Sequence, residues 1–233
     1  EGSARMAANL VARYGVGWLR LMPSLKATVA NLSRVYDLQR QGATFETPEA
    51  MFRTLGIYET TQTTAYDYFR GLDVPEAFIE EFIDGASRDN YNQPGTMNAF
   101  ADLVSLAGAA LDGAVYELED GTAAVPRYLL ESAGAEVRLN TTVTAVRAND
   151  GGYVVVDAAG GETAVDSLVV ATPLEFTDIE LPPTAWSGPP RAYQETYAAF
   201  AAGRLSSAFG DAASLDAVLT TETPNLNFSC IGA

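Results

Sequence analysis

Residues 135–147 read Ala-Glu-Val-Arg-Leu-Asn-Thr-Thr-Val-Thr-Ala-Val-Arg, and this stretch decides the fold of the second half of the chain. Several of its residues are β-branched and pack well on a pleated surface, so we expect strands at Glu136–Leu139 and Thr142–Arg147. The turn sequence Asp150-Gly151-Gly152 follows, and β-forming residues return at Tyr153–Asp157. The stretch therefore predicts a β-hairpin with one strand before it.

Further segments surround this hairpin. Pro126–Ser132 predicts a helix that ends at Gly134. The short apolar run at Asp166–Thr172 predicts a buried strand. We also expect strands within residues 192–205 and 216–221.

The first half of the chain, from residue 5 to about residue 111, has helical periodicity instead. Apolar side chains recur at three- and four-residue spacing within Leu25–Leu38. Thr47 precedes a proline, which predicts a capped helix start. Pro75 opens a further helix, and Met97–Leu111 predicts a buried helix with Asp102 as its charged residue.

The order of these elements predicts an α+β fold. We expect a helical part at residues 1–111 and a β-rich part at residues 112–233. Such a layout is typical of a cofactor domain that is interrupted by a substrate domain.

The composition excludes several function classes. The net charge of −16 disfavours nucleic acid and anionic lipid as partners, and solubility is its simplest interpretation. The chain contains no histidine, which excludes a Ser-His-Asp triad and the usual zinc sites, so we expect no metal. Cys230 is the single cysteine, and its β-rich surroundings favour a buried structural role. No apolar run is long enough to predict a transmembrane segment.

The β-rich segments resemble flavoproteins of the amine-oxidase type. In that superfamily a helix leads into a strand like residues 135–146, and a strand like residues 166–174 (Asp-Ser-Leu-Val-Val-Ala-Thr-Pro-Leu) returns to the cofactor domain. The resemblance implies FAD as cofactor and an FAD/NAD(P)-binding fold of which this chain holds an incomplete part. It places the backbone of Val143 beside the adenine, and Ala171, Thr172 and Pro173 near the dinucleotide. The alternative is that these segments are ordinary core strands.

The helical half narrows the resemblance to prenylcysteine oxidase. Its motifs follow one another in unbroken order: Arg13-Tyr14-Gly15, Arg88-Asp89-Asn90-Tyr91-Asn92-Gln93, Met97-Asn98-Ala99-Phe100 and Val104-Ser105-Leu106. This resemblance implies FAD-dependent cleavage of farnesyl- or geranylgeranyl-cysteine to cysteine, a prenyl aldehyde and hydrogen peroxide, with molecular oxygen as acceptor. It also implies a role in the degradation of prenylated proteins and a lysosomal, vacuolar or secretory location. Three sequons, which begin at Asn31, Asn140 and Asn227, would permit a glycoprotein.

The same motifs supply the substrate-binding residues that the resemblance implies. They are Arg88, Asn90, Tyr91, Gln93, Asn98 and Phe100. A guanidinium can hold a carboxylate in a fork, so Arg88 is the candidate for the substrate carboxylate, while no catalytic residue is identified. The alternatives are that Arg88 pairs with Asp84 or Asp89 at the surface, and that the aromatic side chains nearby are core.

Two features separate this chain from a complete enzyme of that family. The turn Glu119-Asp120-Gly121-Thr122 departs from a Glu-Gly-Gly-Asn-like sequence, and no Gly-x-Gly-x-x-Gly turn for the FAD pyrophosphate is present. We therefore expect residues 1–233 alone to bind FAD weakly and to be inactive. The competing hypotheses are another amine-oxidase-type flavoenzyme and a non-catalytic lipid-binding relative.

Overall fold

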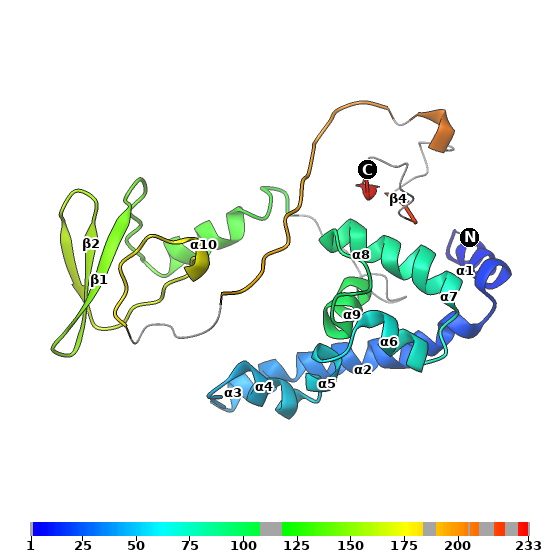
Figure 1. The fold of residues 1–233 in the computed structure, drawn as a ribbon, viewed down its shortest axis with the longest axis horizontal. Helices are drawn as coiled ribbons and strands as arrows, with labels where there is room; N and C mark the ends of the chain where they lie inside the picture. Colours follow the sequence, from blue (N-terminus) through cyan, green and yellow to red (C-terminus); the bar gives the residue numbers. More distant parts are fainter. Residues whose placement is uncertain are drawn as a thin grey trace. The chain divides into compact units, whose positions relative to one another are not determined.

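The computed structural model describes residues 2–107, 118–183, 190–204, 206–209, 217–221 and 228–232 (Figure 1). Two compact units divide the chain, one made of Glu1–Tyr116 with Ala198–Ala233 and the other of Glu117–Tyr197. Helices and strands both occur, which is compatible with the predicted α+β class. Residues 198–233 group with the helices, whereas the predicted β-rich part covers residues 112–233. The assignment of the two parts to substrate and cofactor stays a prediction.

The first unit is built mainly of helices. They are α1 (Gly2–Tyr14), α2 (Leu21–Ser33), α3 (Val35–Arg40), α4 (Pro48–Leu55), α5 (Tyr58–Thr61), α6 (Ala65–Gly71), α7 (Glu76–Phe78), α8 (Asp84–Tyr91) and α9 (Ala99–Ala107), with a 3-10 turn η1 (Gly17–Arg20) and a π-helical turn η2 (Ile79–Ile83). The helix predicted at Leu25–Leu38 is divided into α2 and α3 at Arg34. The one predicted at Met97–Leu111 corresponds to α9, and residues 108–111 of that prediction lie outside the described residues.

Two helix starts follow the predictions from sequence. The Thr47 hydroxyl accepts a hydrogen bond from the Ala50 amide at 3.1 Å, and Pro48 occupies the first turn of α4. The helix predicted after Pro75 continues from α7 through η2 into α8. Because a π turn bonds residue i to residue i+5, η2 accommodates one extra residue in this continuous helix.

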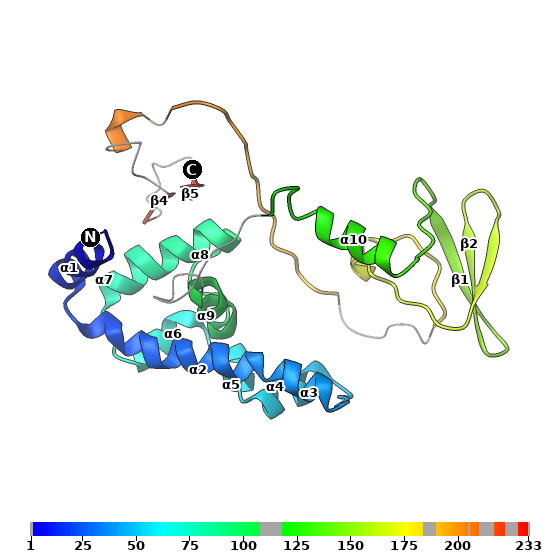
Figure 2. The ribbon, with the colours of Figure 1, turned by 180° about the vertical axis from the view of Figure 1, so that it is seen from behind.

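The buried apolar side chains of the first unit come mainly from α2, α6, η2 and α9. Figure 2 shows the helices α2, α6 and α9 of this unit. Phe78 is 2% exposed and stacks on Phe82 with ring centroids 4.8 Å apart, while Leu103 is fully buried. Together with Trp18 and Phe69 these side chains form one apolar cluster. Phe78 and Leu103, with Phe82 against them, are therefore packed core in this unit, which was the alternative from sequence, whereas Tyr91 is 37% exposed. Within the described residues, no helix has the length and apolar character needed to cross a membrane.

A short antiparallel strand pair completes this unit. β4 (Ala217–Leu219) lies within the strand predicted at residues 216–221, and β5 (Cys230–Gly232) pairs with it. Both strands contact α8. Cys230 is half-buried, and its Sγ lies 3.6 Å from the Arg88 carbonyl oxygen. The pKa of its thiol is raised, mainly because burial disfavours the charged thiolate. This setting agrees with a structural cysteine.

The second unit contains an antiparallel three-stranded sheet in the order β1-β2-β3. Helix α10 (Ala124–Ser132) precedes β1 (Val143–Asn149), β2 (Gly152–Asp157) and β3 (Glu162–Val165), and a 3-10 turn η3 (Leu174–Phe176) follows. The predicted helix and hairpin are confirmed. Gly151 and Gly160 adopt positive φ angles of 97° and 84° in the two turns, which explains why glycine occupies both.

Three strand predictions are wrong within the described residues. Glu136–Leu139 and Asp166–Thr172 are irregular, and Val169 is 86% exposed. A strand needs a neighbour for its backbone groups, and the described chain offers neither segment one. Residues 192–204 are likewise without strand, and residue 205 lies outside the described part.

Candidate functional site

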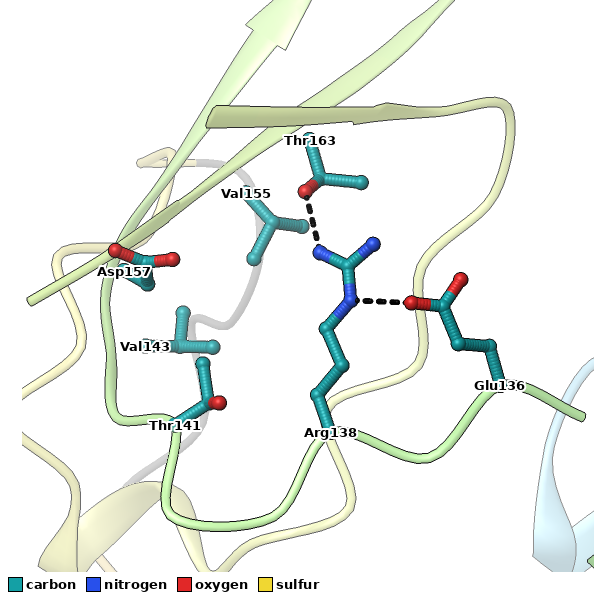
Figure 3. Close-up of a pocket in the computed structure, with 7 residues that line it drawn as sticks. All are labelled: Glu136, Arg138, Thr141, Val143, Val155, Asp157 and Thr163. Carbon is teal, nitrogen blue, oxygen red and sulfur yellow. Dashed lines mark hydrogen bonds and ion pairs between the residues drawn. The ribbon is translucent and has the colours of Figure 1, made fainter. Parts of the chain in front are cut away.

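A cavity of about 370 Å³ lies on one face of the three-stranded sheet (Figure 3). It is lined by Glu136, Arg138, Thr141, Val143, Val155, Asp157 and Thr163. The register explains why the strand residues share this face, since Val143 lies opposite Asp157 and Val155 lies opposite Thr163. The irregular segment after α10 brings Glu136, Arg138 and Thr141 to the same space.

Val143 lies where the sheet departs from regular pairing. The register shifts between Val143 and Ala145, so two steps along β1 correspond to one step along β2. Thr144 at this bulge turns to another partner: its carbonyl accepts the Glu180 amide at 2.9 Å. A bulge loosens the ladder and often lies beside a ligand site. Val143 thus lines the cavity beside a bulge, and its contact with an adenine stays a prediction.

Arg138 is the cation among the residues that line this cavity. Its Nε donates to Glu136 Oε1 at 2.8 Å and its Nη1 to Thr163 Oγ1 at 3.1 Å (Figure 3). Their mutual hydrogen bond, the largest cause for each, lowers the pKa of Glu136 and raises that of Arg138. Asp157 adds a second carboxylate, whose Oδ1 accepts the Gly161 amide at 2.8 Å. Two carboxylates against one guanidinium suit an uncharged base or ribose better than a pyrophosphate.

The other predicted cofactor residues lie elsewhere in this unit. Ala171, Thr172 and Pro173 are exposed and lead into η3. The next residue, Leu174, lines a second cavity of about 360 Å³ with Val146, Tyr153, Leu168, Val170, Leu181 and Pro182. The described structure thus does not bring Val143 and the Ala171–Pro173 segment to one cavity.

Arg88 is the predicted substrate residue whose surroundings differ most from expectation. Its side chain is 3% exposed, and Nη1 lies 3.6 Å from Asp84 Oδ2, whose side chain is 7% exposed. Its Nη2 donates to the Thr220 carbonyl. The pairing with Asp84 was one alternative from sequence, but the pair is buried and not at the surface.

The remaining predicted substrate residues lie around the end of α8 and the start of α9. Asn90 is exposed and donates to Ser105 Oγ at 2.8 Å, and Asn98 caps α9 by accepting the Ala101 amide at 2.9 Å. Phe100 is half-buried against Phe52, with ring centroids 5.9 Å apart.

Tyr91 and Gln93 flank Asn92, which ends α8 with a positive φ of 52°. Tyr91 is 37% exposed and Gln93 is half-buried. Among the polar predicted substrate residues, these are the two side chains for which the described structure shows no hydrogen bond within the unit.

Sequence reasoning missed a buried polar cluster beside Arg88. The Ser87 hydroxyl donates to Asp102 Oδ1 at 2.6 Å, and Asp102 is fully buried. Within the described residues Asp102 Oδ2 has no hydrogen-bond partner. Desolvation, helped by the negative charge of Asp84, raises the pKa of Asp102 to about 6 against the Ser87 hydrogen bond. The lone charge in the apolar run at residues 97–111 was the signal that could have marked this position.

Comparison with known proteins gives one family. The family model described as prenylcysteine lyase matches residues 4–233. The chain is 29% identical over 226 residues to "Farnesylcysteine lyase" of Arabidopsis thaliana, covering 95% of this chain and 45% of that protein. It is 31% identical over 173 residues to "Prenylcysteine oxidase 1-like" of Mus musculus, covering 70% of this chain and 34% of that protein. It is 26% identical over 250 residues to "Prenylcysteine oxidase 1" of Homo sapiens, covering 96% of this chain and 48% of that protein. The chain therefore spans less than half the length of these relatives.

Proposed function

Since the chain belongs to the prenylcysteine lyase family, we propose that it forms part of an FAD-dependent thioether oxidase. The proposed substrates are farnesyl- and geranylgeranyl-cysteine, and the products are cysteine, a prenyl aldehyde and hydrogen peroxide. Such an oxidoreductase would serve the degradation of prenylated proteins. The family match over residues 4–233 is the observation that carries this proposal.

The chemistry divides between cofactor and chain. FAD, when bound, would supply the acceptor for a hydride from the carbon beside the substrate sulfur and return the electrons to molecular oxygen. Water would then add to that carbon, and the hemithioacetal would release cysteine and the prenyl aldehyde. The chain's own task would be to hold FAD and the substrate. The bulge at Val143 supports a backbone contact to the adenine, and the Ala171–Pro173 segment is proposed to lie near the dinucleotide. This division requires no imidazole, in keeping with a chain that has no histidine.

On the substrate side, two residues are best placed to contact a ligand. Tyr91 and Gln93 carry polar groups at the end of α8, whereas Asn90 and Asn98 already hold Ser105 and the first turn of α9. The prenyl tail would supply most of the binding, because each buried CH₂ contributes about 0.8 kcal/mol. We propose Tyr91 and Gln93 as contacts of the polar cysteine end.

The test uses the whole protein to which residues 1–233 belong. Incubation with farnesylcysteine should yield peroxide and farnesal in equal amounts, and the purified protein should show flavin absorbance. A benzylic or aliphatic amine serves as the comparison substrate. Turnover of the amine without turnover of farnesylcysteine would favour another amine-oxidase-type enzyme. Tight farnesylcysteine binding without flavin or peroxide would favour a non-catalytic lipid-binding protein.

A variant pair tests the cofactor contact. Val143→Pro removes the backbone N–H, while Val143→Ala keeps it and shortens the side chain. We expect the proline variant to lose bound flavin, measured as the ratio of absorbance at flavin and protein wavelengths. The alanine variant should retain it. Equal flavin content in both folded variants would contradict a backbone role for Val143.

A further inference from the structure

Helix α8 supports the strand pair β4–β5 through several contacts along its length. The Arg88 guanidinium donates to the Thr220 carbonyl directly after β4, and Cys230 of β5 approaches the Arg88 carbonyl. Gly85 lies beneath Leu219, so closely that a Cβ added at Gly85 would lie 2.8 Å from the Leu219 Cβ. Helix and strand therefore meet almost backbone to backbone at this position.

The orientation of Arg88 is fixed from the other side by Asp84. The Asp84 carboxylate accepts the Gly95 amide on Oδ1 at 2.8 Å and the Tyr66 hydroxyl on Oδ2. Burial first, and then the hydrogen bond to Asp84, raise the pKa of Tyr66 to about 12, so this phenol stays a donor. A carboxylate held in this way cannot turn aside to release Arg88 without leaving buried donors unpaired.

These contacts bear on which group binds the substrate. Arg88 Nε has no hydrogen-bond partner within the described residues, but it is buried. A substrate carboxylate at Arg88 would therefore have to enter the packed interior to reach Nε, replace the Thr220 carbonyl, or lie beside the buried Asp84, where two like charges repel each other. We propose that Arg88 is a positioning residue, which acts through Thr220 to fix the β4–β5 pair on α8, and that the substrate carboxylate binds elsewhere. The second half of this statement rests on the proposed function.

The enzymatic test compares farnesylcysteine with its methyl ester, which lacks the carboxylate charge. Arg88→Gln should lower kcat/KM for the acid and the ester by the same factor, and Asp84→Asn should repeat this pattern. Arg88→Lys keeps the charge and should recover part of the activity. Arg34→Gln, at an exposed arginine of the same unit, is the matched control and should leave both substrates unaffected. If Arg88→Gln lowered kcat/KM for the acid roughly tenfold or more beyond its effect on the ester, the proposal would be overturned.

A second measurement does not depend on activity. Hydrogen exchange in peptides covering β4 and β5 should be faster in Arg88→Gln and Asp84→Asn than in wild type or Arg34→Gln. Unchanged exchange in the folded variants would refute the positioning role even if the protein turned over neither substrate. Absence of turnover in the wild type, by contrast, would count against the proposed function alone.

Discussion

Replacing Asp102 by asparagine should remove the pH dependence that this buried carboxyl imposes on the stability of the first unit. Its pKa is about 6 in the folded protein, against 3.8 for an ordinary aspartate. The folded state therefore binds the proton more tightly, and the group costs nothing well below pH 3.8, where both states are protonated. Stability is lost as pH rises from 3.8 to about 6, because the unfolded carboxyl has ionised while the folded one still holds its proton, and above about 6 the folded state buries a charge. The gap between 3.8 and about 6 corresponds to a loss of about 3 kcal/mol in the free energy of unfolding.

Asparagine has nearly the same shape and keeps an oxygen for the Ser87 hydroxyl, but it carries no charge at any pH. Relative to wild type, Asp102→Asn should therefore gain about 3 kcal/mol between pH 4 and pH 8. Glu76 and Glu81 contribute equally to both proteins, because their lowered pKa values arise from hydrogen bonds with Arg70 and Arg13.

Urea unfolding followed by the fluorescence of buried Trp18 measures this difference, with Trp186→Phe in both proteins to isolate the signal. Glu80→Gln removes an exposed charge from the same unit and should show no comparable pH-dependent gain. A constant difference between Asp102→Asn and wild type from pH 4 to pH 8 would show that the carboxyl is not desolvated as described.

Other perturbations have equally definite outcomes. Gly85→Ala should destabilise the first unit by about 1–3 kcal/mol, because the added Cβ would collide with Leu219 and displace β4. Hydrogen exchange in β4 should then be faster, and unchanged exchange would contradict the contact. Thr47→Ala should cost about 1 kcal/mol in urea unfolding while Thr47→Ser costs little, since serine keeps the capping oxygen; equal losses would exclude the cap as the cause. The net charge of −16 should make the folded protein repel itself, and salt screens this repulsion as the Debye length falls from about 10 Å at 0.1 M to about 3 Å at 1 M. The unfolding midpoint should therefore rise between 0.1 and 1 M KCl, and it should rise less in the double variant Glu46→Gln, Asp150→Asn. A midpoint independent of salt would refute net self-repulsion.

Local signals predicted most of the elements. Periodicity and capping residues located α4 and the helix after Pro75, and the glycine turns located β1 and β2, because short-range sterics decide those structures. The strand expected at Asp166–Thr172 failed for a different reason. Its apolar composition is suited to a sheet, but pairing depends on a neighbour that sequence periodicity does not supply.

The candidate sites show the same limit. The bulge at Val143 and the approach of Glu136 to the cavity depend on register and on an irregular segment, neither of which composition encodes. Arg88 was recognised as an important position, yet its partner Thr220 lies 132 residues away along the chain. Charge and spacing alone cannot identify a carbonyl at that separation.

The π turn η2 has a consequence for how this helix can vary among homologous chains. Each residue added to or removed from a helix rotates everything beyond it by about 100° about the axis. If one residue were deleted from Ile79–Ile83, the π turn could close to ordinary α-helical winding and the helix would stay continuous. The residues after it would then face a different direction around the helix axis. Arg88 and Gly85 would then point away from the strands they now meet. A homologue without the π turn would need its arginine and glycine at shifted sequence positions to contact the strands in the same way. An alignment based on residue identity alone would then suggest, wrongly, that both residues had been lost.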